Sequence, residues 1–346
     1  MTQEIVISAL DKNNKFTPII SSYQLSKDGK LESGIQPNSR IRPYISIRLE
    51  VQNGTPTTCM LSIGNPPMDI LGNVVGKVFK IYIGYAGLMN GKFQAKMSSV
   101  FVGAVFQNPT REDSGQGTDQ IMNIPLSLYN MANGNSTSFS TNQKVQDVIK
   151  GVFAGNTSVE YSPSSLATQP LKNPFTFNKG DSQEDVINFF RDAEGISIQI
   201  FPNKIVVTNQ AQIKKDTSNK NVKAVIIHNQ EVSKSGVNGT PSFRLNADKS
   251  TFSNDYYPRV NTFIKSKYAV IGIDNTLNID LAFVIPQILQ NMYVAIENVG
   301  TNINIFHANK NVKTKDVNMV FCVISQLIVF STWGDSTHQL RLLYDS

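Results

Sequence analysis

The spacing of apolar residues most constrains what this chain can form. Along the sequence their period changes from two residues, as in a strand, to 3.6 residues, as in a helix, and back to two residues. In residues 45–51, isoleucine, leucine and valine alternate with serine, arginine and glutamate. Such alternation is typical of a strand with one buried face. Asn53-Gly54, a pair that favours tight turns, precedes a second alternating run through Cys59, Leu61 and Ile63. The sequence therefore predicts an antiparallel hairpin here.

Further strands are predicted in the first third of the chain. Residues 77–85 and 100–106 are apolar runs with the period of a strand. Gly64-Asn65-Pro66-Pro67 and Asn108-Pro109 interrupt the runs, because proline cannot donate the hydrogen bond that a central strand requires. Several short strands separated by such turns indicate a small barrel or sandwich.

Between about residues 135 and 210 the apolar spacing fits α-helices instead. Residues 145–153 carry apolar side chains at i, i+3, i+4, i+7 and i+8, and Gly155 follows them. Ser140 and Gln143 precede this run with the spacing of a capping box. The pattern predicts one amphipathic helix.

A second helix is predicted to begin at Asp181, with Glu184 three residues later, and to end at Gly195. Glycine is typical of this last position because it takes the left-handed conformation at little cost. Residues 196–200 and 205–207 then alternate again, so the helix is followed by a predicted hairpin.

The last third returns to strands after a polar stretch. Residues 211–258 are rich in polar and turn-forming residues, which predicts a connector that is partly ordered around 224–227. Strand-like runs then follow at residues 263–273, 277–285, 292–297, 319–330 and 339–344.

The predicted fold class is mainly β with an α+β insert. A chain of 346 residues is long enough for two or three domains. We expect two small tube-like β-barrel or sandwich domains that flank a helix-plus-hairpin module: a first tube-like domain over residues 1–133, the insert over 134–212, and a connector with a second tube-like domain over 213–346. This order also suggests two related halves.

Charge argues against a dedicated nucleic-acid binder. The net charge is +6, but only 17% of the residues are charged, and basic residues are most dense at Lys214, Lys215, Lys220 and Lys223. Nucleic-acid binders usually concentrate positive charge more strongly than this. We interpret these lysines as part of a solvated loop.

No leader or membrane anchor is expected. The first residues, MTQEIVISAL, lack the basic and long apolar regions of a signal peptide. The most apolar stretch, residues 319–330, is shorter than the roughly 20 residues of a membrane-spanning helix. We expect a soluble protein that is made in a cytoplasm.

Cysteine and histidine provide no metal-ligand pattern. Cys59 and Cys322 lie in separate strand-like runs and are expected to be buried free thiols. His228, His307 and His338 do not have the spacing of zinc ligands, and each is interpreted as a surface or strand histidine.

Acidic clusters have structural explanations. Glu112-Asp113 precedes a glycine-rich stretch and is interpreted as solvated loop charge. Asp181, Glu184 and Asp185 lie at the start of the second predicted helix, where the helix dipole favours negative charge. Capping therefore explains them without catalysis.

Two aromatic positions are candidates for contact with a partner. Trp333, the one tryptophan, lies between two predicted strands. Its ring could stack on a sugar, although packing at a domain edge or subunit interface is the favoured interpretation. Tyr256-Tyr257-Pro258 is a candidate contact loop.

No linear motif indicates catalysis. Gly84-Tyr85-Ala86-Gly87 and Gly115-Gln116-Gly117 are interpreted as turns, because they lack the strand, spacing and helix of phosphate-binding motifs. We therefore predict no catalytic residue, no cofactor site and no metal site.

Several segments in one order resemble the central baseplate hub proteins of contractile phage tails and phage-tail-like injection systems, a family similar to late control protein D. They include the alternating strand at 45–51, the glycine-bounded run Gly76-Lys-Val-Phe-Lys-Ile-Tyr-Ile-Gly-Tyr85 and Val100-Phe-Val-Gly-Ala-Val-Phe106. Residues 175–207 resemble the family's α/β module, and Phe330-Ser-Thr-Trp-Gly334 with Gln339-Leu-Arg-Leu-Leu343 resembles the end of its second barrel. Residues 225–260 match poorly.

The resemblance implies a non-enzymatic structural protein of the virion. Hub proteins form homotrimers whose two tube-like domains per chain give a pseudo-sixfold ring, a symmetry adaptor between tail tube and central spike. Implied partners are the tail spike protein, the tail tube or distal tail protein, the tape-measure protein and the baseplate wedge proteins. DNA would pass through the channel only in transit during genome ejection. The implied location is the tail baseplate, assembled in the host cytoplasm.

Two other classes of function remain open. A β-rich carbohydrate-binding or receptor-binding tail protein would use Trp333, Tyr256 and Tyr257 beside asparagine-rich loops. A cell-wall hydrolase could use two carboxylates that are distant in sequence.

Overall fold

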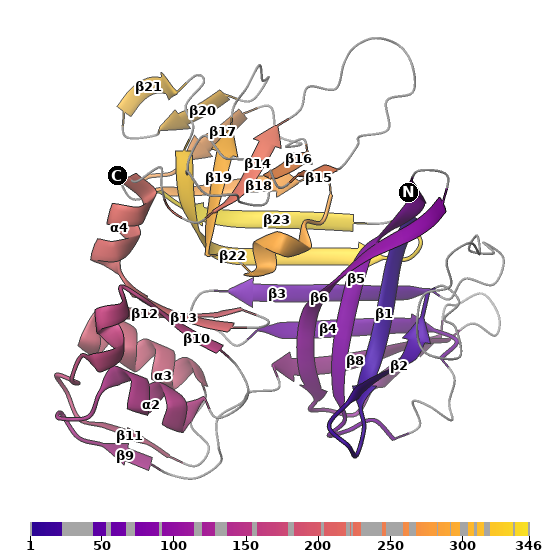
Figure 1. Cartoon of the computed structure of the whole chain (residues 1–346), viewed down its shortest axis with the longest axis horizontal. Helices are drawn as coiled ribbons and strands as arrows, with labels where there is room; N and C mark the ends of the chain where they lie inside the picture. Colours follow the sequence, from indigo (N-terminus) through magenta and orange to yellow (C-terminus); the bar gives the residue numbers. More distant parts are fainter. Residues whose placement is uncertain are drawn as a thin grey trace. The chain divides into compact units, whose positions relative to one another are not determined.

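A computed structural model of the chain shows a mainly β protein with a small helical insert, which confirms the predicted fold class (Figure 1). The residues that it describes are 2–22, 44–52, 57–66, 73–89, 92–113, 120–128, 137–153, 158–178, 183–201, 204–218, 222, 224–229, 244–246, 259–262, 268–281, 283–290, 292–297, 304–307, 310–314, 319–334 and 336–344.

The chain divides into two compact units. The first unit comprises Met1–Glu50, Thr57–Met131 and Ile328–Ser336, and the second comprises Val51–Pro56, Ala132–Leu327 and Thr337–Ser346. The second unit holds both the insert and the C-terminal strands. The domain boundaries expected at residues 133 and 212 stay predictions.

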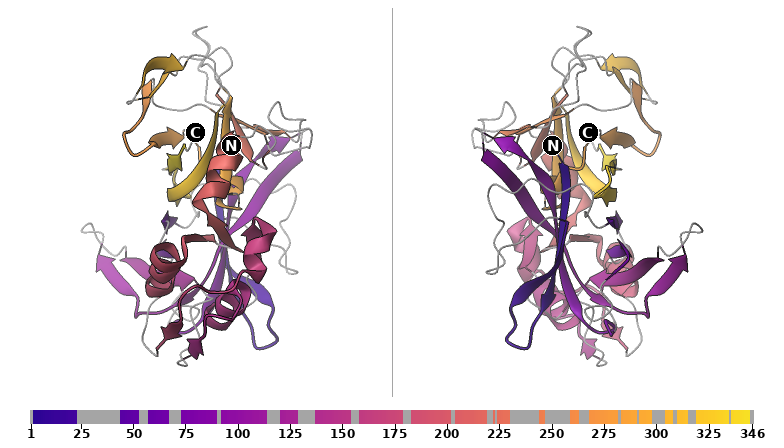
Figure 2. Two further views of the ribbon diagram at one scale, coloured as in Figure 1. Left: turned by 90° about the vertical axis from the view of Figure 1, so that its left-hand side faces the viewer. Right: turned by 90° about the vertical axis from the view of Figure 1, so that its right-hand side faces the viewer.

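The first unit is a sheet of antiparallel strands, coloured indigo to purple and seen from two further sides in Figure 2. Along the sheet the order is β3-β4-β8-β6-β5-β1-β2, with β7 paired to β8 and the end of β22 beside β3. The strands are β1 (Thr2–Leu10), β2 (Phe16–Ser21), β3 (Ile45–Gln52), β4 (Thr58–Gly64), β5 (Val78–Met89), β6 (Lys92–Val105), β7 (Thr110–Asp113), β8 (Gln120–Leu128) and β22 (Met319–Ser331).

Alternation in the sequence directs one face of each strand into the core of the first unit. The predicted hairpin is confirmed, because β3 and β4 pair antiparallel from Ile45 with Ile63 to Glu50 with Thr58. The apolar positions of both strands are buried and the positions between them are more exposed. The Asn53-Gly54 turn lies outside the described residues.

Gly103 marks a close approach between strands in this core. A side chain at this position would place its Cβ 2.2 Å from the Phe101 ring and 2.5 Å from the Ser127 carbonyl oxygen. Only glycine therefore allows β6 and β8 to pair here.

Two predictions for the first unit are wrong in detail. Gly84-Tyr85-Ala86-Gly87 lies within the long strand β5 and not in a turn, and Gly84 pairs with Glu4 of β1. Glu112 and Asp113 lie in the short strand β7 and not in a loop. Gly115-Gln116-Gly117 falls outside the described residues.

The insert of the second unit contains the predicted helices and hairpin. A parallel pair and an antiparallel pair form the sheet β10-β13-β12, and β9 pairs with β11. The elements are β9 (Thr137–Phe139), α2 (Val145–Val152), β10 (Ser158–Ser162), η1 (Ser164–Thr168), β11 (Phe175–Phe177), α3 (Gln183–Phe189), η2 (Phe190–Glu194), β12 (Ile196–Phe201), β13 (Lys204–Asn209) and α4 (Gln210–Ser218).

The structure corrects the beginning of the first predicted helix. The N-cap of α2 is Lys144, which makes no side-chain capping bond, and not Ser140. One half of the capping box is present, since the Ser140 N–H donates to Gln143 Oε1 over 2.7 Å. This bond spans residues 140–143 and so lies before the N-cap, where it closes a turn that precedes α2.

The end of the second predicted helix is confirmed. Gly195 follows the helix with a φ of 68°, the left-handed conformation that the sequence predicted for it. The last turn, η2, is a π-helix, which the sequence pattern did not indicate.

The predicted connector at residues 211–258 begins as a helix. α4 spans Gln210–Ser218, and Asn209 Oδ1 accepts a hydrogen bond from the Gln212 N–H over 2.8 Å, as an N-cap residue does. Ile213 is buried, but most neighbouring residues are polar, which explains why the apolar pattern did not predict this helix.

The C-terminal strands form the second β region. The main sheet has the order β15-β16-β14-β19-β22, β23 pairs with both β22 and β18, and a separate sheet has the order β17-β20-β21. β14 runs parallel to β16 and β19, whereas β1 to β8 of the first unit pair antiparallel throughout. The elements are β14 (Val225–Asn229), β15 (Arg244–Asn246), β16 (Arg259–Thr262), β17 (Tyr268–Ile271), β18 (Thr276–Leu281), η3 (Pro286–Gln290), β19 (Tyr293–Glu297), β20 (Asn304–His307), β21 (Lys310–Thr314) and β23 (Ser336–Leu343).

Candidate interaction surfaces

Exposed apolar side chains are the features most relevant to function in the described part of the chain. Large apolar side chains there that are exposed are Met60, Val75, Phe106, Val270, Ile273 and Trp333. Ile273 is 81% exposed and Trp333 is 70% exposed, and each lies in a tight turn. Exposed apolar residues on well-fixed turns are suited to contact another molecule.

The Trp333 turn follows β22 in the first unit, between two strands as the sequence predicted. The Ser331 hydroxyl accepts a hydrogen bond from the Trp333 N–H over 3.1 Å. Gly334 has a φ of 108°, which a residue with a side chain rarely adopts, and its N–H donates to the Ser331 carbonyl. The turn therefore has one well-defined backbone conformation.

Two further contacts attach this turn to the sheet. The Ile45 N–H donates to Thr332 Oγ1 over 3.0 Å, and the Thr332 N–H donates to the Ile45 carbonyl over 2.9 Å. The Gln3 side-chain amide donates to the Gly334 carbonyl over 3.3 Å. The start of β1, the start of β3 and the turn are thus fixed together.

Tyr44 forms an aromatic pair with Trp333. Their ring centroids lie 5.2 Å apart at an interplanar angle of 72°, an edge-to-face arrangement. Tyr44 is fixed in turn, because its carbonyl accepts a hydrogen bond from the Gly64 N–H. The pair leaves most of the indole exposed on a rigid support.

The Ile273 turn joins β17 to β18 in the second unit. The Gly272 N–H donates to the Thr276 carbonyl over 2.8 Å, and the Asn275 N–H donates to the Gly272 carbonyl over 3.0 Å. Asn275 has a φ of 59°, which asparagine tolerates better than most residues. Ile273 lies at the tip of this turn, between two strands that belong to different sheets.

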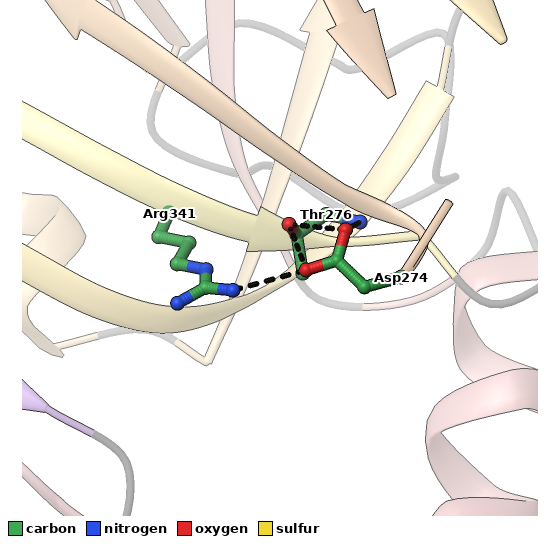
Figure 3. Close-up of polar contacts among 3 residues, drawn as sticks. All are labelled: Asp274, Thr276 and Arg341. Atoms are coloured by element: carbon green, nitrogen blue, oxygen red, sulfur yellow. Dashed lines mark hydrogen bonds and ion pairs between the residues drawn. The ribbon is translucent and has the colours of Figure 1, made fainter. Parts of the chain in front are cut away.

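Asp274 is the anchor of the Ile273 turn (Figure 3). Its carboxylate accepts hydrogen bonds from the Thr276 hydroxyl and N–H, and Arg341 of β23 contacts Oδ2 over 3.0 Å. The hydrogen bonds from Thr276, and then the Arg341 guanidinium, hold the pKa of the Asp274 carboxyl below its usual value.

A third exposed group lies where β5 begins and β6 ends, in the first unit. Val75 is 46% exposed and Phe106 is 48% exposed. The two are neighbours, because the turn around Gly76 exchanges backbone hydrogen bonds with Val105. The exposed lysines Lys12, Lys15 and Lys77 lie in the turns at this same end of the strands.

His338 is the histidine whose side chain the structure describes; it lies in strand β23, which is one of the two predicted alternatives, and it is buried. Its Nδ1 accepts a hydrogen bond from the Ile285 N–H over 3.1 Å, and its Nε2 lies 3.2 Å from Gln326 Oε1. Burial lowers the pKa of His338 to about 3, so the ring is neutral and fixed in one tautomer. The side chains of His228 and His307 lie outside the described residues.

Both cysteines are buried free thiols, as predicted. Burial raises the pKa of the Cys59 thiol well above its usual value. Burial also raises the pKa of Cys322 to about 12. Neither thiol is positioned as a nucleophile, because the thiolate is the reactive form.

The acidic and basic candidates are spread over the surface. Glu112 is exposed and accepts a hydrogen bond from the Asn123 side chain over 2.8 Å. Asp185 is exposed in the first turn of α3, in agreement with its interpretation as a helix-start residue. Lys214 and Lys215 lie on α4 and not in a loop. Asp181, the Glu184 side chain, Lys220, Lys223 and Tyr256-Tyr257-Pro258 lie outside the described residues.

The described ranges offer little for the binding of a metal ion or a small ligand. No group of three or more His, Cys, Asp or Glu residues there could hold a metal ion. A cavity beside Gln199 and Gln326 offers about 10 Å³, enough for no more than one water. Among the described helices, none is long and apolar enough to cross a membrane.

Sequence reasoning missed three buried carboxylates among the described residues, Glu4, Asp216 and Glu194, and each accepts a hydrogen bond from within the fold. Glu4 of β1 accepts one from the Ser22 hydroxyl. Asp216 of α4 accepts a hydrogen bond from the Tyr293 hydroxyl over 2.6 Å, and burial raises the pKa of Tyr293. Glu194 accepts the backbone N–H groups of Lys172 and Asn173 over about 3 Å. Asp216 and Glu194 lie among exposed polar neighbours in their own elements, so the sequence carries no local signal of their burial.

Comparison with known proteins finds similarity in three dimensions. No protein-family model and no curated protein match the chain. The tail protein from Neisseria meningitidis MC58 matches with a TM-score of 0.49 and 10% identity, over 98% of this chain and 96% of that one. The 43 kDa tail protein of prophage MuSo2 from Shewanella oneidensis matches with a TM-score of 0.45 and 10% identity, over 100% and 98% of the two chains.

A third solved structure comes from a secretion machine. The E. coli c3393 protein, a component of the type VI secretion system, matches with a TM-score of 0.44 and 9% identity, over 91% of this chain and 77% of that one. These three solved structures are two phage tail proteins and a secretion-system component.

Proposed function

We propose that this protein is a structural component of a phage tail or of a related injection machine, and that it acts as a baseplate hub. In this role three copies form a ring with pseudo-sixfold symmetry that joins the tail tube to the central spike. The ring leaves a channel through which DNA passes in transit. Shape and contact between proteins, and not chemistry at an active site, would carry the function.

The observation that carries this proposal is the way in which large apolar side chains are presented. Trp333 and Ile273 are the most exposed of them, and each lies on a turn that hydrogen bonds fix in one conformation. The described residues include no group of three or more His, Cys, Asp or Glu side chains that could hold a metal ion. Rigid exposed apolar residues are the anchors of protein interfaces, because no side-chain or loop freedom is lost on binding.

The order of elements also supports the proposal. β strands, a helix-and-hairpin insert and a second set of β strands follow one another as in the hub resemblance drawn from the sequence. By that resemblance the partners are the spike protein, the tube or distal tail protein, the tape-measure protein and the baseplate wedge proteins. The virion tail baseplate is the corresponding location.

The state of association tests the proposal directly. Sedimentation equilibrium of the full chain at rising concentration should give the mass of three chains, and negative-stain images should show rings about one tail tube wide. A protein that stays a single chain at high concentration, and that binds neither spike nor tube protein, would contradict the hub.

A second candidate function is carbohydrate or receptor binding, which the exposed Trp333 ring favours. An indole on a rigid turn can stack on a sugar ring. Binding of surface glycans by the wild type, lost in Trp333→Ala and kept in Met60→Ala, would favour this function. Equal binding by both variants would remove its support.

We also propose that the chain is not an enzyme. A cell-wall hydrolase would need two carboxylates facing one cleft. Glu112 accepts a hydrogen bond from the Asn123 side chain, and Glu4, Asp216 and Glu194 are buried in structural hydrogen bonds. Release of soluble fragments from purified peptidoglycan by the protein would contradict this proposal.

A further inference from the structure

Strand β18 of the second unit has one edge without a partner among the described strands, because it pairs only with β23 on its other side. The register of this pair continues to Asn275 and Tyr344, and the Tyr344 N–H donates to the Asn275 carbonyl over 2.9 Å. Bonded and non-bonded residues alternate along an antiparallel pair, so residues 277, 279 and 281 direct their backbone groups towards β23. The backbone groups of the residues between them point away from β23.

The free edge of β18 therefore offers the N–H and C=O groups of Asn278 and Asp280. Neither backbone bonds to another strand in the described part of the chain. The Thr276 carbonyl points to the same side, where the Gly272 N–H already donates to it. Asn278 is exposed and Asp280 is partly exposed. A row of unpaired backbone donors and acceptors is a template to which a further strand can add.

Strand β6 of the first unit also has an open edge. Its last residues, 103–105, pair with β8. Residues 92–98 pair with β5 alone among the described strands. Val100, which lies between these two parts, has no partner in the β5–β6 register and forms a bulge that bends the strand. Seven consecutive residues of β6 thus have a strand neighbour on one side only, within the described chain.

The other described edges of the first unit are less suited to an added strand. In β2 the Asp11 N–H donates to the Lys15 carbonyl, and alternation from this bonded pair directs Pro18 away from β1. Proline has no N–H to donate, so Pro18 blocks the edge of β2. Strand β7 is only four residues long. The open stretch of β6 is therefore the longest edge that the first unit offers among its described strands.

The open edges of β18 and β6 are compatible in length. At roughly 3.3 Å per residue, residues 277–281 of β18 extend over about 17 Å and residues 92–98 of β6 over about 23 Å. β18 can therefore lie along β6 over its whole free edge. Main-chain hydrogen bonds give such a contact its affinity, so it does not require a special pair of side chains.

We propose that β18 of one copy adds to the open edge of β6 in the next copy, so that a second unit pairs with a first unit at each boundary between copies. This inference rests on the proposed trimer. In a pseudo-sixfold ring of three chains the two kinds of unit alternate, and each boundary between copies joins one unit of each kind. A contact made from one edge of each kind repeats around the ring and leaves neither edge open.

A proline at the free edge of β18 tests the backbone contact. The Asn278 N–H points away from β23, so Asn278→Pro removes no hydrogen bond of the β18–β23 pair. Asn278→Ala keeps the N–H and is the matched control. Asn278→Pro should weaken trimer association by about tenfold or more, and Asn278→Ala by less than about threefold. Equal association of the two variants in sedimentation equilibrium would overturn the proposal, and circular dichroism verifies that both are folded.

Cross-linking tests the same contact without a proline. Ser98→Cys lies in β6 and Asn278→Cys lies in β18. The two single variants carry different tags and are co-expressed, so any product that contains both tags joins two copies. A bis-maleimide should give this mixed product. Cys59 and Cys322 are buried and should stay unmodified.

Two controls define which edges meet. Thr17→Cys is exposed on β2, beside Pro18, and should give no product with Asn278→Cys. Neither Asn278→Cys nor Ser98→Cys should give a covalent dimer when it is expressed alone, because a heterologous contact never brings an edge to its own copy. A dimer from Asn278→Cys alone would indicate a symmetric pair of β18 strands and overturn the proposal. Absence of the mixed product would overturn it as well.

The results separate this contact from the proposed hub. A wild-type trimer without the mixed product would reject the contact and leave the hub intact. The mixed product together with assemblies of more than three chains would support the contact and reject the closed ring. A wild type that stays monomeric and gives no product would reject both.

Discussion

The turns of Trp333 and Ile273 present comparable side chains in different ways. The Trp333 turn is fixed by Ser331 and Thr332, which are buried and uncharged. The Ile273 turn is fixed by Asp274 and Arg341, which are charged and half-exposed. Buried uncharged hydrogen bonds respond little to salt or pH, whereas an exposed ion pair is screened by salt. The protein thus contains one turn that solution conditions barely affect and one that they affect directly.

Acid should lower stability more than any other change proposed here, through His338 in β23 of the second unit, the strand whose Arg341 supports the Ile273 turn. Between pH 6.5 and 3 the unfolded state binds a proton at His338, whose pKa is about 3 when folded. The neutral ring therefore makes its full contribution to the free energy of unfolding above pH 6.5. This contribution decreases as the pH falls, by up to roughly 5 kcal/mol near pH 3. Urea unfolding of the second unit across this range measures the slope.

A titration-silent variant is the control for this effect. His338→Asn keeps an acceptor for the Ile285 N–H and should flatten the slope between pH 6.5 and 3 while lowering stability at neutral pH. An unchanged slope in the variant would show that other groups cause the loss.

Backbone strain should distinguish the two turns next. Gly334→Ala should destabilise the first unit by about 1–3 kcal/mol, because a φ of 108° is strained for alanine. The strain is in the backbone alone, since no atom lies within 4 Å of the added Cβ. Asn275→Gly should be neutral or stabilise by a few tenths of a kcal/mol, since glycine adopts a positive φ freely. The urea midpoints of the two variants measure this difference. Equal midpoint shifts would contradict the expected strain at position 334.

Loss of one hydroxyl should also affect the turns unequally. Thr332→Val leaves the buried Ile45 N–H without its acceptor, at a cost of about 1–3 kcal/mol. Thr276→Val removes hydrogen bonds that water can replace, and its cost should stay within about 0.5 kcal/mol. Thermal unfolding of the paired variants tests this, and a larger loss in Thr276→Val would reverse the comparison.

The smallest effect is expected from the charge of Asp274. Its pKa is lowered in the folded protein, so its contribution is present above its ordinary pKa near 3.8 and is lost as pH falls below that value. Asp274→Asn should remove this acid-dependent part and the salt dependence of the Ile273 turn. Amide exchange of Thr276 in low and high salt measures both, and an unchanged salt dependence would argue against the ion pair as anchor.

The sequence predicted the elements whose cause is local. Alternation placed β3 and β4, and the glycine after residue 194 placed the end of the second helix, because period and backbone freedom act within a few residues. α4 was missed because its contacts are polar and its cap, Asn209, belongs to the preceding strand.

The candidate surfaces could be predicted only in part. Trp333 was expected between two strands, but its exposure depends on Ile45, 287 positions away from Thr332 in the sequence. Ile273 was predicted as the last residue of a strand, because nothing local shows that Asp274 and the distant Arg341 hold a turn there. Long-range partners decide which residues a turn exposes, and spacing alone does not identify them.

The solitary indole has a practical consequence. Trp333 is the one tryptophan of the chain and its ring is largely exposed to solvent. Fluorescence excited at the red edge of the spectrum therefore reports on a single known spot, with emission at long wavelength and ready quenching by iodide. Any molecule that covers Trp333 should shift the emission to shorter wavelength. Binding of a partner at this surface can therefore be detected without an attached dye.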